Sequence, residues 1–132
     1  MEVAKQLQGR YSCLQEIDQI TKETQEAFAR NDAESARMLL GMRGECMEKA
    51  DRYREKEEKL FSTLEHTEAK LLNGLIHNEV TAEEFPEQCR KAAAIIAVVS
   101  ENTRKLLDRI IQNDQVMNRR ITGSKSYYQK KD

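Results

Sequence analysis

The fold class is decided by residues 33–76, which read AESARMLLGMRGECMEKADRYREKEEKLFSTLEHTEAKLLNGLI. From position 36 onward, apolar side chains recur at spacings of three and four, the period of an α-helix that buries one face. No proline interrupts the stretch. At about 1.5 Å per residue it would form a helix about 66 Å long. We therefore expect one very long helix here, either continuous or bent or split.

Two glycines, Gly41 and Gly44, lie inside this stretch. Each costs about 1 kcal/mol relative to alanine in the interior of a helix. They indicate either a bend or a place where a neighbouring backbone approaches closely. Close packing is the interpretation that we favour.

The preceding segment has the same helical period from Val3 to Phe28. Asn31 and Asp32 follow it, and both side chains compete for backbone hydrogen bonds and favour the start of a new helix. The sequence therefore predicts a first helix to about residue 30 and a very short turn into the second.

A third helix is predicted after the sequence Thr81-Ala82-Glu83-Glu84, which has the pattern of a capping box ahead of Phe85-Pro86. Its apolar stripe continues to Ile121, and Gly123 is a plausible C-terminal cap. These predictions combine into an all-α fold, an elongated antiparallel bundle of three long helices over residues 1–123, followed by a flexible, polar and basic tail over residues 124–132.

Composition agrees with a helical chain and excludes several function classes. Of 132 residues 34% are charged and the net charge is −1, with five glycines, one proline and a mean hydropathy of −0.79. The charge is uneven, because residues 119–132 hold five basic and one acidic side chain. Residues 43–59 hold six basic and six acidic residues, so they lack the positive excess of a nucleic-acid stripe.

No apolar run approaches the roughly 18 residues of a membrane span, and the first ten residues do not resemble a signal peptide. A cytoplasmic protein is therefore expected. The three cysteines, Cys13, Cys46 and Cys89, are far apart and lack CxxC spacing, so neither a disulfide framework nor a zinc site is indicated. The chain has no phosphate-binding glycine loop, GxSxG or HExxH motif. We expect no enzyme activity, cofactor or metal.

The third predicted helix is apolar over more than one face, since Ile95 and Val98 lie well away from its main stripe. A wide stripe fits burial between two other helices equally as well as a groove for a partner helix. For the second interpretation, the expected partner-binding residues lie along the main stripe, with one tyrosine in the basic tail. They are Val99, Leu106, Ile110, Met117, Ile121 and Tyr127.

Four segments resemble small flagellar type III export chaperones of the FlgN and FliT kind. They are LQEIDQIT at 14–21, AFARNDAE at 27–34, MLLGMRGECMEKAD at 38–51 and NTRKLLDRII at 102–111. Asn113, Gly123 and Tyr127 are similar to the polar end of the last helix and tail of the FlgN proteins.

The resemblance implies a cytoplasmic chaperone without ATPase activity. Such a protein binds an amphipathic C-terminal helix of a late export substrate, either a hook-associated or a filament-cap protein, and prevents premature assembly. The export apparatus is a second partner of this kind of protein. Two alternatives stay open: a homodimeric coiled-coil scaffold or regulatory adaptor that pairs through residues 36–76, and a nucleic-acid-associated regulator that uses the basic tail.

Overall fold

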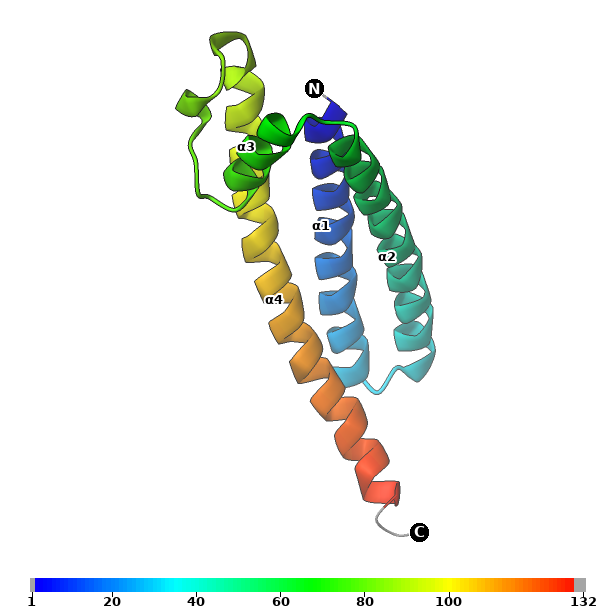
Figure 1. Ribbon diagram of the computed structural model, residues 1–132. Coiled ribbons are helices and arrows are strands. Elements are labelled where there is room, and N and C mark those ends of the chain that lie inside the picture. Colours follow the sequence, from blue (N-terminus) through cyan, green and yellow to red (C-terminus); the bar gives the residue numbers. More distant parts are fainter. Residues whose placement is uncertain (1, 130–132) are drawn as a thin grey trace.

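The computed structural model describes residues 2–129, with side chains to residue 119, and shows four α-helices (Figure 1). No strand occurs in this part of the chain, so the all-α prediction is confirmed. The helices are α1 (Glu2–Ala29), α2 (Ala33–Ser62), α3 (His66–Ile76) and α4 (Arg90–Gln129), with two short 3-10 helices, η1 (Ala82–Glu84) and η2 (Glu87–Cys89), before α4.

The predicted turn between the first two helices is confirmed. Asn31 has a positive φ of 59°, a conformation that asparagine tolerates better than most residues. The side chain of Asp32 then accepts a hydrogen bond of 3.1 Å from the backbone N–H of Ser35 and caps α2. These two residues reverse the chain, so α2 runs antiparallel to α1.

The predicted second helix is split between Ser62 and His66. The Ser62 hydroxyl donates to the carbonyl of Lys59 and the Thr63 hydroxyl to that of Leu60, each at 2.7 Å. Such local side-chain bonds compete with helix propagation, and Glu65 has an extended backbone. The chain changes direction here, although its apolar period continues into α3.

The favoured interpretation of the glycine pair, close packing, is wrong. Helix α2 runs without a break through Gly41 and Gly44, and a Cβ atom at either position would meet no other atom within 4 Å. The close approach occurs instead at Gly9, where a Cβ would lie 2.3 Å from the ring of Tyr53. Gly9 therefore lets α1 and α2 pack tightly near the end of α2.

The predicted ends of the third helix are also wrong. Glu84 does accept a hydrogen bond of 2.8 Å from the backbone N–H of Thr81, but this contact closes η1. Phe85 is extended because Pro86 disfavours helical geometry in the residue before it, and α4 begins only at Arg90. At the other end α4 passes Gly123 and continues to Gln129, since a glycine costs a helix only about 1 kcal/mol.

Helix α1 lies between α2 and α4, and α4 runs parallel to it (Figure 1). Both neighbours pack against α1, whereas the backbones of α2 and α4 approach each other at very few positions. Helix α3 packs against the first part of α4. Three groups of buried side chains form the core. The upper cluster is Val3, Leu7, Leu72, Leu75, Phe85, Ala93 and Ile96, the middle cluster is Leu14, Ile17, Leu106 and Ile110, and the lower cluster is Ile20, Ala27, Ala36 and Leu39.

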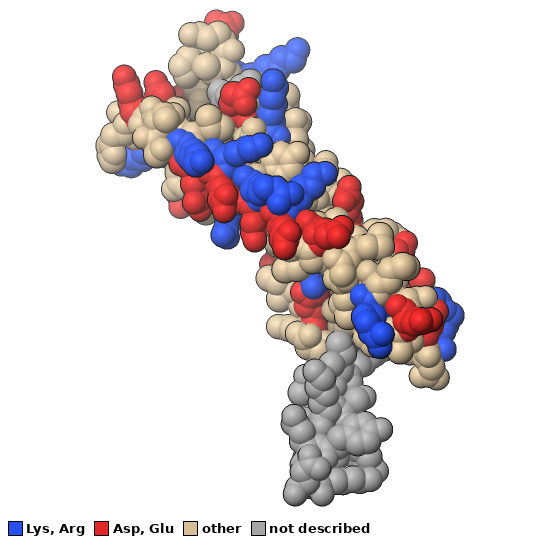
Figure 2. Space-filling view, turned by 90° about the vertical axis from the view of Figure 1, so that its right-hand side faces the viewer, with Lys and Arg blue, Asp and Glu red and all other residues tan. Residues whose placement is uncertain are grey.

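The outer face of α2 is highly charged. Seen from that side, Lys and Arg side chains lie beside Asp and Glu side chains along most of the face (Figure 2). This is the expected appearance of a solvated helix face with both signs interleaved. Within residues 2–129, no helix has the length and hydropathy needed to span a membrane.

Candidate functional site

A groove runs over the middle of α1 between α2 and α4, and we call it the α2–α4 groove. It exists because both helices pack on α1, while their backbones approach each other at very few positions. Leu14 and Ile17 of α1 form its floor. The other lining residues are Met47, Ala50, Asp51 and Arg54 of α2, Leu107 and Ile110 of α4, and the polar side chains of Arg10, Arg43 and Asp114.

The floor of the groove is apolar, and its α2 wall combines the apolar Met47 and Ala50 with the exposed charged side chains of Asp51 and Arg54. Its floor residues and Ile110 are buried core residues that offer the groove only a small part of their surface. Met47 on one wall is 47% exposed, and Leu107 on the other is half-buried. The groove therefore presents apolar side chains from both walls to solvent.

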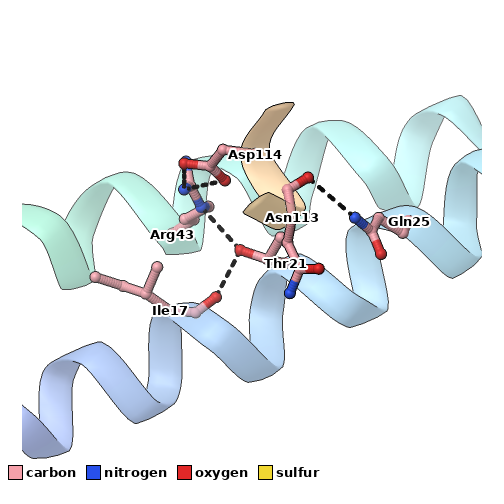
Figure 3. A network of polar contacts seen from close by, with 6 residues as sticks. All are labelled: Ile17, Thr21, Gln25, Arg43, Asn113 and Asp114. Carbon is pink, nitrogen blue, oxygen red and sulfur yellow. Dashed lines mark hydrogen bonds and ion pairs between the residues drawn. The ribbon is translucent and has the colours of Figure 1, made fainter. Parts of the chain in front are cut away.

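At its lower end the groove is crossed by Arg43, which ties three helices together (Figure 3). Its guanidinium Nη2 donates to both carboxylate oxygens of Asp114 on α4 at 2.6 Å, and its Nε donates to the Thr21 hydroxyl on α1 at 3.0 Å. The Thr21 hydroxyl in turn donates to the carbonyl of Ile17. Nearby, the Gln25 side chain donates to the carbonyl of Asn113 at 3.2 Å. The network fixes α4 beside α1 at this level.

At its upper end the groove meets a second pair of charges, Arg10 and Glu57. The Nη1 atom of Arg10 lies 3.6 Å from Oε2 of Glu57, whose side chain is almost fully buried. Burial is the main cause that raises the pKa of Glu57, and the nearby Glu58 adds to it, while Arg10 and Arg54 oppose the shift. Beyond this pair lies a further hollow between α1, α2 and α3. It is lined by Leu7, Arg10, Glu57, Glu58, Phe61, Asn73 and Ile76.

The two charged contacts set the length of the apolar part. Arg10 and Thr21 lie eleven positions apart on α1, which corresponds to about 16 Å or three helical turns. Three turns are enough for an amphipathic helix to place three or four apolar side chains in a groove. Because the walls are two helices and the floor is a third, such an occupant would lie in the place of a missing fourth helix.

Most residues predicted to bind a partner lie in the protein's own core. Leu106 and Ile110 pack in the middle cluster, Met117 is buried, and Val99 is half-buried against the upper cluster. Of these four, only Ile110 borders the groove. The side chains of Ile121 and Tyr127 lie outside the described residues.

The sequence pattern did contain the polar residues of the groove. Arg43 and Glu57 occur in phase with the apolar positions of residues 36–76, together with Met47. A charged residue in phase with a buried face has to find a partner or an exposed edge. Arg43 does so with Asp114 and Glu57 with Arg10.

Thiol chemistry is not favoured at the partly buried Cys46. Burial is the first cause that raises its pKa, and the neighbouring Glu16, whose carboxylate accepts a hydrogen bond of 3.2 Å from the thiol, raises it further. A reactive cysteine requires the opposite shift.

Comparisons of the chain with protein families, curated protein sequences and solved structures find no match.

Proposed function

We propose that this protein is a binding protein of the chaperone type, which holds an amphipathic helix of a client protein in the α2–α4 groove. The separation of α2 and α4 carries the proposal, because it leaves apolar side chains on two walls above an apolar floor. A helix placed there would bury its own apolar face against Met47 and Leu107. Covering that face would prevent the client from associating through it.

The shape of the groove suits a complex that must later be released. Its apolar part is only about three helical turns long, and much of its floor is already packed within the protein. Buried area of this size, set against the entropy lost on association, supports moderate rather than very tight binding.

For the client we propose a late flagellar export substrate, a hook-associated or filament-cap protein with an amphipathic C-terminal helix. The support is the resemblance of residues 14–21, 27–34, 38–51 and 102–111 to the FlgN and FliT kind of export chaperone. In this proposal the protein acts in the cytoplasm without ATP, keeps its client unassembled and delivers it to the export apparatus.

The proposal is tested by binding of fluorescently labelled synthetic peptides that correspond to the C-terminal helices of hook-associated and cap proteins. Met47→Glu should weaken binding at least about tenfold, because it places a charge against the apolar face of the peptide. Met47 is the appropriate position because it is half-exposed, whereas a charge at the buried Ile110 would unfold the bundle.

The matched control is Met38→Glu, the same change on the same helix at a methionine that is 62% exposed and does not line the groove. It should leave peptide binding unchanged. Equal losses for the two variants, or retained binding by both, would contradict the groove as the binding site. Circular dichroism of both variants checks that the helices are intact.

A homodimeric scaffold is the second candidate, favoured by two exposed apolar side chains on α4. Ile95 is 41% exposed and Val98, three residues later, is 59% exposed. Sedimentation over a range of concentrations tests this candidate. Self-association that Val98→Glu abolishes would favour the scaffold, and a monomer at all concentrations would exclude it.

A further inference from the structure

Glu57 is a buried acid with one carboxylate oxygen unused. The residue is only 6% exposed, and its Oε2 faces Arg10. Its Oε1 is buried and has no hydrogen-bond partner in the part of the protein that the structure describes. A buried, ionised oxygen without a donor is costly. Such a group lowers the stability of the fold, and this cost is explained if the oxygen binds another molecule.

The surroundings of Glu57 differ from those of the other buried acid, Asp18. One carboxylate oxygen of Asp18 is also unpartnered, but its Oδ2 lies 3.5 Å from the ammonium of Lys22 and 3.2 Å from the guanidinium of Arg109. Two cations therefore compensate Asp18 within the bundle. Glu57 has one cation within ion-pair distance, Arg10 at 3.6 Å, and Arg54 acts on it from farther away. Glu57 also lines an open hollow.

The hollow beside Glu57 is lined by acidic and by apolar side chains. Leu7, Phe61 and Ile76 contribute apolar surface from α1, α2 and α3, and two glutamates face a single arginine. A lysine or arginine side chain matches both properties, because its methylene stem packs against apolar groups while its head donates hydrogen bonds to a carboxylate.

The position of this hollow gives it a role in the proposed complex. Arg10 lines both the hollow and the α2–α4 groove, so the two adjoin at this residue. At the opposite end, Arg43 and Asp114 satisfy each other with two hydrogen bonds. Of the two ends of the groove, the upper one therefore has a buried carboxylate oxygen without a hydrogen-bond donor among the described residues, and the lower one does not.

We propose that the client helix inserts one lysine or arginine side chain into the hollow beside Glu57, and that this contact fixes the direction of the helix in the groove. The inference rests on the proposed function. The basic residue lies about one helical turn beyond the apolar stripe, as Arg10 lies one turn before Leu14 on the floor. A helix laid in the opposite direction would bring its basic residue to the closed Arg43–Asp114 end and leave Oε1 of Glu57 without a donor.

The test uses the full-length protein and synthetic amphipathic helices of about 20 residues, each with a three-turn leucine stripe. The peptides differ at one position, a turn beyond the stripe, which is Lys, Met or Glu. A fourth peptide carries the Lys at the other end of the stripe. We expect the first Lys peptide to bind about tenfold more tightly than the Met peptide, and the Glu peptide to bind most weakly.

Glu57→Gln should abolish the preference for the Lys peptide over the Met peptide. The matched control Glu58→Gln changes an exposed acid of the same hollow and should keep most of the preference. The Lys/Met comparison on the unaltered protein needs no substitution, so it decides the question even if Glu57→Gln perturbs folding.

The experiments distinguish failure of the groove as the binding site from failure of the Glu57 contact. Equal binding of the Lys and Met peptides, with loss of both in Met47→Glu, would overturn the role of Glu57 and leave the groove in place. Equal binding of the two Lys peptides would overturn the fixed direction. Absence of binding by every peptide, or binding that Met47→Glu does not alter, would overturn the groove and the Glu57 contact together.

Discussion

The same face of α1 is covered at the upper end of the molecule and uncovered in the groove below it. At the upper end, α3 and the segment before α4 cover Val3 and Leu7 with Leu75, Phe85 and other side chains of the upper cluster. Further down, past the end of α3, no element of the described chain covers the groove above Leu14. The comparison shows that the split of the long predicted helix closes one end of the bundle and leaves the middle open.

The largest loss of stability should come from a substitution in the core of the covered upper end. Ile96 is fully buried in the upper cluster, so Ile96→Ala should lower the free energy of unfolding by about 3 kcal/mol through lost burial and the cavity left behind. Val98→Ala, two positions along α4 and largely exposed, should cost less than about 0.5 kcal/mol. Urea denaturation measures both, and similar costs would contradict the assignment of the core.

Breaking the polar contact at the lower end of the groove should have a smaller and more local effect. Arg43→Met leaves the Asp114 carboxylate and the Thr21 hydroxyl without this donor, at a cost of about 1–3 kcal/mol. Backbone amides of α4 near Asp114 should exchange hydrogen faster, while those near Ile96 should keep their protection. Arg37→Met, at an exposed position of α2, is the control. Faster exchange along the whole helix would contradict the separate anchoring of its two parts.

Two glycines distinguish the face of α2 that packs on α1 from the face that is exposed to solvent. Gly9→Ala should destabilise the protein by about 1–3 kcal/mol, because the ring of Tyr53 has to move. Gly41→Ala should stabilise it by about 0.5–1 kcal/mol, since the new methyl group meets nothing and alanine favours the helix. Thermal denaturation of the pair provides the measurement, and effects of the same sign would contradict this packing.

The smallest effect concerns pH. Folding raises the pKa of Glu57, mainly by burial, above its ordinary value of 4.5. The native state therefore holds this proton more tightly than the unfolded state, and ionised Glu57 costs stability that grows as the pH rises through the raised pKa. Glu57→Gln should be more stable than the unaltered protein at neutral pH. The difference should shrink towards zero below pH 4.5. A difference that is constant with pH would contradict a buried, ionising Glu57.

Local interactions were predictable from the sequence. The end of α1 and the start of α2 follow from Asn31 and Asp32, whose own backbone and side-chain bonds make the turn. The split at Thr63 was not located, because the apolar spacing passes through it unchanged, and its local signal is the pair of hydroxyl bonds at Ser62 and Thr63. The start of α4 was misplaced for a similar reason, since the capping contact at Thr81 belongs to η1.

The groove could be predicted only in part. Periodicity identifies Ile110 and Met117 as one apolar face, but it does not say whether that face meets the protein's own helices or a partner. The structure places both in contact with the core. The choice depends on how far apart α2 and α4 lie, which is a property of the assembled helices and not of either sequence segment.

The two walls of the groove, α2 and α4, also differ in when they can pack against α1 during folding. The bond from Arg43 to Thr21 joins residues 22 positions apart, whereas Gln25 and Asn113 are separated by 88. Contacts close in the chain form faster than distant ones because less loop entropy is lost. A growing chain can therefore complete the α1–α2 hairpin while α4 is still being synthesised, and pulse-labelled hydrogen exchange during refolding should show α1 and α2 protected before α4. The α2–α4 groove is then the last part of the protein to form.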